Sequence, residues 1–136
     1  MENLIIEKDK SVIVCQASSF PDGIMDAFQQ LHIKVPDAFK RTTYGISRPE
    51  GSMDHIVYKA AVDESYEGEG KELDFATFII PAGSYKSITI KDFMKKPEAI
   101  GNAFNELLRV QNLDPDGFCL EIYKDDNEVI CAVPLN

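Results

Sequence analysis

PDGIMDAFQQL at residues 21–31 returns as PEAIGNAFNEL at residues 97–107, more than half the chain length further along. The identical pairs are Pro21/Pro97, Ile24/Ile100, Ala27/Ala103, Phe28/Phe104 and Leu31/Leu107. Solenoid repeats have units of roughly 20–50 residues, so this spacing is too long for a solenoid. The repeat instead predicts one domain, residues 1–136, built from two similar halves with any ligand site between them.

The similarity extends on both sides of these segments and defines half-repeats of about 4–62 and 78–135. Each half begins with a short apolar stretch and ends with two more. The residues between the halves, 63–74, are rich in acidic residues and glycine, which is typical of a solvated linker.

Both repeated segments have the pattern of an amphipathic helix. Each begins with proline, which is tolerated in the first helical turn. The apolar residues then recur at positions i, i+3, i+4 and i+7, which places them on one helix face. Each half is therefore expected to contain strand, strand, helix, strand and strand. The predicted fold class is α+β, an antiparallel sheet with two helices packed on it.

Local patterns add expectations about how the strands connect. The polar residues between strands 4–7 and 12–16 favour a hairpin turn. Residues 124–127 also suit a turn, whereas 48–54 resembles a longer, mobile loop. In the segment FCLEIY, 118–123, side chains alternate between the two faces of a strand. Phe118, Leu120 and Ile122 are expected to cover the helix of their own half, with Cys119, Glu121 and Tyr123 on the other face.

Composition excludes several functional classes. The chain has 14 basic and 23 acidic residues and a net charge of −9, without the basic clusters that bind phosphates, so direct nucleic-acid binding is not expected. No apolar run approaches the roughly 20 residues that span a bilayer, so no membrane interaction is expected. The N-terminal MENLIIEKDK lacks the features of a signal peptide, which favours a cytoplasmic location.

The sulfur and imidazole side chains do not form a recognisable site. Cys15, Cys119 and Cys131 lie in apolar segments without a CxxC motif, and His32 and His55 are isolated. We expect buried thiols, no metal and no cofactor. Cys119 also lacks a histidine base that would make it a nucleophile.

The C-terminal half resembles a known family. It contains Ile-Pro-Ala-Gly-Ser-Tyr at 80–85, then the repeated helix, then Glu-Ile-Tyr at 121–123 and Val-Pro-Leu at 133–135. In this order the segments resemble the GyrI-like superfamily. Its members are effector-binding domains of multidrug-responsive AraC-type and MerR-type regulators, and also occur alone. The resemblance implies pseudo-twofold half-domains and a cleft between them lined by aromatic residues, with an acid at its base. The absence of tryptophan departs from many members.

Within this resemblance, Glu121 corresponds to the acid, and Tyr123 and Tyr85 to aromatic walls. Tyr58 and Phe104 are further candidates. Packing explains Tyr58 at least as well as ligand contact, and it is the favoured explanation for Phe104 and its repeat partner, Phe28. A carboxylate in an apolar strand is costly to bury unless it is paired. An unpaired one beside tyrosine rings favours lipophilic cations. The alternative, a solvated Glu121 on an exposed face, stays open.

The favoured function is therefore binding of small amphipathic, cationic organic ligands, with a link to transcription. Two alternatives stay open. The first is a hydrolase of the GyrI-like type, in which Glu121 and Tyr123 position or activate water. The second is a protein–protein module that resembles the gyrase inhibitor of the superfamily. A protein partner or a homodimer is compatible with either.

Overall fold

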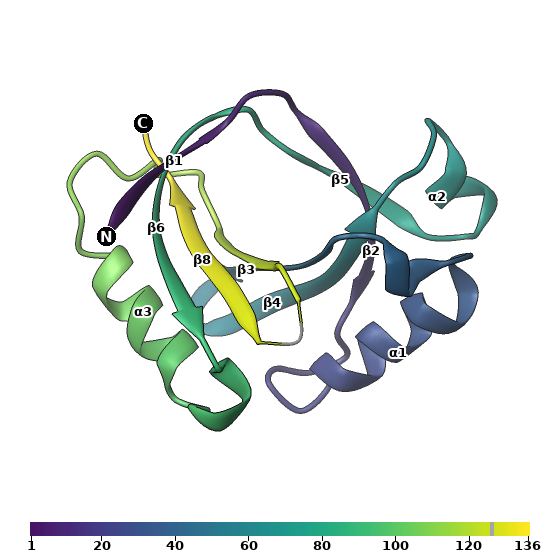
Figure 1. Ribbon diagram of the computed structural model, residues 1–136, viewed down its shortest axis with the longest axis horizontal. Helices are drawn as coiled ribbons and strands as arrows, with labels where there is room; N and C mark the ends of the chain where they lie inside the picture. The colour runs from purple at the N-terminus through teal and green to yellow at the C-terminus, as the bar shows by residue number, and fades with distance from the viewer. Residues whose placement is uncertain (126) are drawn as a thin grey trace.

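Eight strands form one curled antiparallel sheet in the computed structural model, which describes residues 1–125 and 127–136 (Figure 1). Their order across the sheet is β1-β6-β8-β7-β3-β4-β2-β5. In chain order they are β1 (Glu2–Ile6), β2 (Lys10–Gln16), β3 (Thr43–Glu50), β4 (Ser52–Asp63), β5 (Ala76–Ile80), β6 (Gly83–Lys91), β7 (Cys119–Tyr123) and β8 (Glu128–Pro134). The predicted α+β class with an antiparallel sheet is confirmed.

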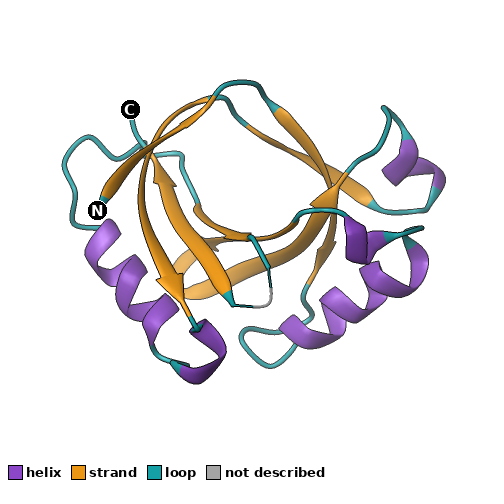
Figure 2. Cartoon of the chain, in the orientation of Figure 1, coloured by secondary structure: helices purple, strands orange, loops and turns teal. Residues whose placement is uncertain are grey.

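The two longer helices lie on the same side of the curled sheet, toward its opposite ends (Figure 2). They are α1 (Ile24–Lys34) and α3 (Ala99–Leu107), and they begin shortly after Pro21 and Pro97, as the repeat predicts. Helix α1 packs on β2 and β4, and α3 packs on β6 and β8. No helix among the described residues combines the length and apolar character needed to cross a bilayer.

Short helices complete the fold. They are the 3-10 turns η1 (Ala38–Lys40) and η2 (Phe93–Lys95) and the helical turn α2 (Glu69–Glu72).

Alternation along the strands divides the apolar residues into two sets. One set fills the inside of the curl and joins residues of the outer strands to residues of the central ones. It includes Val12, Val14, Tyr44, Ile46, Ala61, Ile80, Tyr85, Leu120 and Ala132. The other set forms two clusters beneath α1 and α3.

The predicted orientation of β7 is wrong. Leu120 lies inside the curl, together with Phe118 and Ile122, and does not cover a helix. Cys119 and Tyr123 pack instead with α3. The concave side of the curled sheet encloses an apolar core, and the fully apolar face of β7 contributes to that core. The face that carries Glu121 is therefore the helix side of the sheet.

The predicted hairpin between the first two strands is also wrong. β1 pairs with β6, its Leu4 opposite Tyr85. β2 pairs with β4 and with β5. Each outer strand therefore hydrogen-bonds to a strand from the other half of the sequence.

The segment 48–54 is a continuous part of the sheet and not a long loop. β3 and β4 extend through it as a hairpin, and their pairing becomes irregular between Pro49 and Glu50. Gly51 has a φ of +80°, a left-handed conformation that suits glycine at a tight turn. The turn predicted at 124–127 includes Asp126, which lies outside the described residues.

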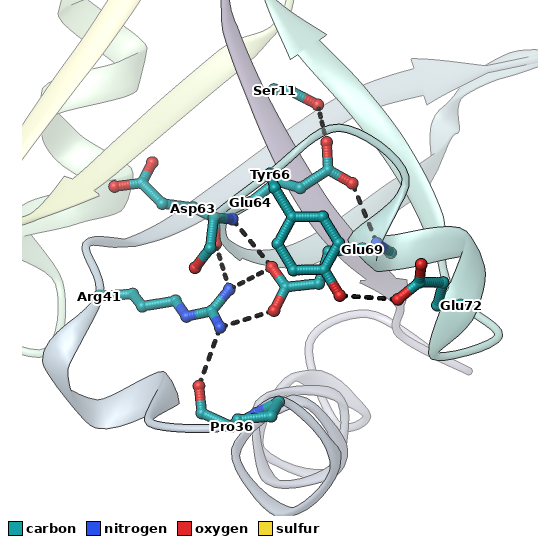
Figure 3. A network of polar contacts seen from close by, with 10 residues as sticks. Ser11, Pro36, Arg41, Asp63, Glu64, Tyr66, Glu69 and Glu72 are labelled. Atoms are coloured by element: carbon teal, nitrogen blue, oxygen red, sulfur yellow. Dashed lines mark hydrogen bonds and ion pairs between the residues drawn. The ribbon is translucent and has the colours of Figure 1, made fainter.

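Residues 63–74 are folded, which differs from the solvated linker expected. Helix α2 lies in this segment, and Glu69 is only 4% exposed. The guanidinium of Arg41 donates to both carboxylate oxygens of Glu69, at 2.6 and 2.7 Å (Figure 3). It also donates to the backbone carbonyls of Pro36 and Asp63. The ion pair therefore fastens the connection between the halves to the region that follows α1.

Candidate functional site

β7 places Glu121 at the middle of the sheet. Its register partners are Gly45 on β3 and Cys131 on β8. The strands covered by α1 and α3 lie on either side of the β7–β3 pair. Glu121 consequently faces the space between the two helices, on the helix side of the sheet.

Two phenols hold the same oxygen of the Glu121 carboxyl group. The hydroxyl of Tyr58 donates to Oε1 at 2.9 Å, and the hydroxyl of Tyr123 donates to it at 2.5 Å. Glu121 is 7% exposed and Tyr58 is 2% exposed, so these contacts are largely shielded from water. Among the described residues no group donates a hydrogen bond to Oε2, and this oxygen is not fully buried. One oxygen is therefore fixed by the protein, and the other can accept an outside donor.

Gly45 makes this arrangement possible. A Cβ at position 45 would overlap the hydroxyl of Tyr58 and would lie 2.6 Å from Oε1 of Glu121. Because glycine leaves this volume free, the phenol can cross β3 and reach the carboxylate. The glycine opposite Glu121 thus has a steric role in the site.

Aromatic rings enclose the two tyrosines. Phe28, from α1, meets both rings edge-on, with centroids 6.2 Å from Tyr58 and 6.2 Å from Tyr123. Phe20 stacks on Tyr58 at 6.0 Å, and Phe93 of η2 lies edge-on to Tyr123 at 5.5 Å. We call Glu121, Tyr58, Tyr123 and these three phenylalanines the Glu121 site.

The electrostatics of the Glu121 site favour added positive charge. Burial raises the pKa of Glu121, and the hydrogen bonds from Tyr123 and Tyr58 oppose that shift. Burial, followed by the nearby Glu121 charge, raises the pKa of both phenols, which therefore remain protonated donors. The ion pairs within residues 1–125 and 127–136 are Lys10–Asp63 and Arg41–Glu69, and neither involves Glu121. The protein thus holds a buried carboxyl group without a cation of its own.

The structure brings together three of the five predicted site residues, Glu121, Tyr123 and Tyr58. Phe104 packs beneath α3, in the same cluster as Tyr123. Tyr85 lies elsewhere, inside the curl beside Phe118, and its hydroxyl donates to the backbone oxygen of Pro81. Tyr85 is therefore not part of the Glu121 site. Tyr44 also lies inside the curl and is 2% exposed.

The cysteines near Glu121 are poorly suited to nucleophilic chemistry. Burial, together with the Glu121 charge, raises the pKa of Cys119 to about 11 and that of Cys131 to about 12. Both thiols are therefore protonated at neutral pH. Across the described part of the chain, no cluster of three histidine, cysteine, aspartate or glutamate side chains could hold a metal ion.

Sequence reasoning missed several residues of the site. The structure confirms that Phe28 packs beneath α1, but its contact with both tyrosines was not predicted. Phe20 and Phe93 carry no periodic pattern and are placed by the loop before α1 and by η2. Gly45 becomes meaningful only once its register with Glu121 is known.

Comparison with solved structures identifies the fold. An integron cassette protein from the mobile metagenome of Vibrio cholerae, VCH_CASS2, has a TM-score of 0.63 and 14% identity, with 99% of this chain and 95% of that chain covered. SAV2435, bound to tetraphenylphosphonium, has a TM-score of 0.66 and 12% identity, with 100% and 94% covered. A hydrolase from Listeria innocua has a TM-score of 0.59 and 11% identity, with 99% and 91% covered.

Sequence comparison adds nothing to this likeness. No family model matches the chain, and no curated protein matches it. At these low identities the shared property is the fold.

Proposed function

We propose that this protein binds small amphipathic organic cations at the Glu121 site. The observation that carries the proposal is the buried Glu121 carboxyl group. It has no cationic partner in the described part of the chain, two phenols hold one of its oxygens, and aromatic rings lie around it. Phe104, at the margin beneath α3, is a further candidate contact.

A ligand cation would offset the desolvation free energy of the buried Glu121 carboxylate. A buried carboxylate is unfavourable until a counter-charge reaches it. A lipophilic cation supplies that charge and gives up little hydration when it enters. Tyrosine and phenylalanine faces add cation–π attraction of roughly 0.5–2 kcal/mol each. Apolar walls with one carboxylate set few directional requirements, so we expect broad rather than exacting selectivity.

The similar structures support the proposal at the level of fold. SAV2435, which shares this fold, is described as bound to tetraphenylphosphonium, a lipophilic cation. Together with the segments at 80–85 and 121–123, this likeness supports membership of the GyrI-like superfamily. A role as a standalone effector-binding protein linked to transcription would follow.

We extend the proposal to an internal pseudo-twofold relation between the halves. If β1–β4 are exchanged with β5–β8, the strand order β1-β6-β8-β7-β3-β4-β2-β5 reads the same from the opposite end. The proposed axis passes between β7 and β3, beside Glu121. The ligand would then lie at the junction of the halves, with the outer strands exchanged between them.

The decisive experiment compares two ions of the same shape. Tetraphenylphosphonium and tetraphenylborate differ mainly in the sign of their charge. We expect the cation to raise the melting temperature and the anion to have no effect, since a ligand at 100 times its Kd adds about 2.7 kcal/mol of stability. Calorimetry on Glu121→Gln should show at least about 30-fold weaker cation binding, because the charge partner is gone. Equal binding of both ions, or an unchanged affinity in Glu121→Gln, would refute the proposal.

Hydrolysis is a second candidate, which one observation favours. Glu121 is a carboxyl group with a raised pKa, a property of groups that exchange protons with a substrate near neutral pH. A protein with this fold is described as a hydrolase. Mass analysis of bound compounds after incubation separates the candidates. A hydrolase returns its substrate heavier by one water and stops doing so in Glu121→Gln, whereas a binding protein returns it unchanged.

A further inference from the structure

An apolar cavity of about 360 Å³ lies beside the Glu121 site and is separate from its aromatic rings. We call it the apolar hollow. Its lining includes Ser47, Ile56, Leu108, Leu113, Cys119 and Val133, together with the charged residues Arg48 and Asp114. Its volume is within the range of small-molecule pockets, roughly 300–1,000 Å³.

The strand register places the apolar hollow on the same face of the sheet as Glu121. Cys119 lies two residues before Glu121 on β7, so both side chains point to the same side. Ser47 is opposite Cys119 on β3, just as Gly45 is opposite Glu121. Two residues of a strand span roughly 6–7 Å, which is the spacing along β7 between the backbone positions of Glu121 and Cys119.

Other elements close the apolar hollow at the far side. Ile56 belongs to the β3–β4 hairpin, and Leu108 and Leu113 belong to the segment that follows α3. Aliphatic groups dominate this wall, in contrast to the aromatic rings around Glu121. An apolar group in the hollow therefore gains from burial without a directional contact.

Cys119 connects the two regions. Its side chain lines the hollow, and its thiol lies close enough to Glu121 for the carboxylate charge to raise its pKa. A molecule that fills the hollow therefore contacts a residue that neighbours Glu121 on the same face of β7. A ligand that occupies both regions would therefore combine a cation, which pairs with Glu121, and an apolar group, which fills the hollow.

We infer that the apolar hollow is a second subsite, which holds the alkyl or aryl tail of a ligand whose cationic head pairs with Glu121. This inference rests on the proposed function and deepens it. The ligand class becomes bipartite: a compact cation, then an apolar tail that begins within about two strand residues of the charge. Amines and quaternary ammonium compounds with a single tail meet this description.

The test is a series of alkyltrimethylammonium ions, from methyl to octyl, measured by calorimetry beside the matching neutral alkanols. Each buried methylene should strengthen binding about fourfold until the hollow is full. Tetramethylammonium reports on the Glu121 site alone. An affinity that does not change with tail length would overturn the inference.

Matched variants separate the two regions. Leu113→Phe fills the hollow from the segment that follows α3 and should abolish the dependence on tail length while tetramethylammonium binds as before. Ser84→Phe adds the same ring at an exposed position of β6 and should leave the series unchanged. Glu121→Gln should weaken every cation and leave alkanol binding intact. If alkanols bind but tetramethylammonium does not, the proposed function fails; if tetramethylammonium binds but tails add nothing, the second subsite fails.

Thiol labelling tests the same inference without a bulky substitution. In a Cys15→Ser background, Cys119 is the partly exposed thiol, since Cys131 is fully buried. Hexyltrimethylammonium should slow the modification of Cys119 at least tenfold at saturation, whereas tetramethylammonium should not. Equal protection by both ions, or protection by neither, would contradict a tail in the hollow.

Discussion

At the scale of the residue, the site depends on two protonated phenols that share one carboxylate oxygen. Hydrogen bonds from Tyr58 and Tyr123 stabilise the ionised form of Glu121, whereas burial destabilises it, and burial is the larger effect. The fold consequently holds a carboxyl group that is easier to protonate than a free one. A bound cation would instead favour the ionised carboxylate and lower the pKa of Glu121.

This balance predicts the pH dependence of stability. A group whose pKa is raised by folding contributes stability below its unfolded pKa, and that contribution is lost as the pH rises through the folded pKa. As the pH is lowered from about 7 to about 5, the wild type should therefore gain stability relative to Glu121→Gln, whose amide does not titrate. Guanidinium unfolding at both pH values measures the difference. A gap between the two proteins that is constant with pH would contradict a raised pKa.

A pair of glycines tests the steric argument. Gly45→Ala should cost about 1–3 kcal/mol of unfolding free energy, because the new methyl group displaces the Tyr58 hydroxyl and the Glu121 carboxylate. The same change should weaken the binding of tetraphenylphosphonium. Gly101→Ala is the control, since it lies within α3 with open space around it. Alanine at position 101 should raise the free energy of unfolding by about 0.5–1 kcal/mol, because glycine is unfavourable within a helix. Equal effects at the two positions, measured by urea unfolding, would count against the role of Gly45.

Part of the site could be predicted from the sequence. Alternation along 118–123 places Glu121 and Tyr123 on one face, because the side-chain period of a strand is local. Tyr58 is far away in the sequence and reaches Glu121 only through the β4–β3–β7 register. The separation of Tyr85 from Glu121 was not predictable for the same reason, since it depends on which face of β6 turns into the curl.

At the scale of the element, helix α2 and its ion pair hold the connection between the halves. The Arg41–Glu69 hydrogen bonds are the first cause of the lowered pKa of Glu69. The backbone N–H of Ser65 also donates to the Glu69 carboxylate, at 2.8 Å. An acidic, glycine-rich segment is therefore ordered because one of its carboxylates is neutralised and buried.

Glu69→Gln should destabilise the protein by about 1–3 kcal/mol at neutral pH, because the amide offers Arg41 one acceptor oxygen instead of two and no counter-charge. The loss should shrink as the pH falls through the lowered pKa of Glu69, since the wild type then loses the same charge. Thermal unfolding at neutral and acidic pH measures both effects. Glu72→Gln, on the exposed side of α2, is the matched control and should change stability by less than about 0.5 kcal/mol. Similar losses in the two variants would show that the ion pair is unimportant.

The elements themselves were predictable to different degrees. The helices follow from the repeated 3.6-residue pattern, which needs no tertiary information. The partners of β1 and β5 were not predictable, because a polar turn is compatible with a local hairpin and equally with a bend toward a distant strand. In the structure the curl of the sheet brings β6 beside β1, so the partner of β1 is a distant strand.

At the scale of the whole molecule, the outer strands make the two halves of the sequence interdependent, because each pairs with a strand from the other half. A half-repeat taken alone would leave β1 without β6 and β2 without β5. The sequence repeat therefore describes an architecture and not a pair of separable units. The Glu121 site lies in the central β7–β3 region, so a ligand there experiences both the net charge of the chain and the buried Glu121 carboxylate.

The net charge of −9 predicts how salt affects ligand binding. Surface charge attracts a distant cation and speeds its association, and this attraction is screened as the Debye length falls from about 30 Å at 10 mM salt to about 8 Å at 150 mM. The buried pairing with Glu121 is shielded, so dissociation should change little. Stopped-flow tyrosine fluorescence with tetraphenylphosphonium separates the two rates, because two of the five tyrosines lie at the site.

Glu121→Gln provides the contrast, since it removes one acidic group from 23 and leaves the distant field nearly intact. Its association rate should keep the salt dependence of the wild type, while its dissociation becomes at least about 30-fold faster. A cation held only by surface charge would behave differently. Salt would then accelerate its dissociation as well, and Glu121→Gln would resemble the wild type in both rates.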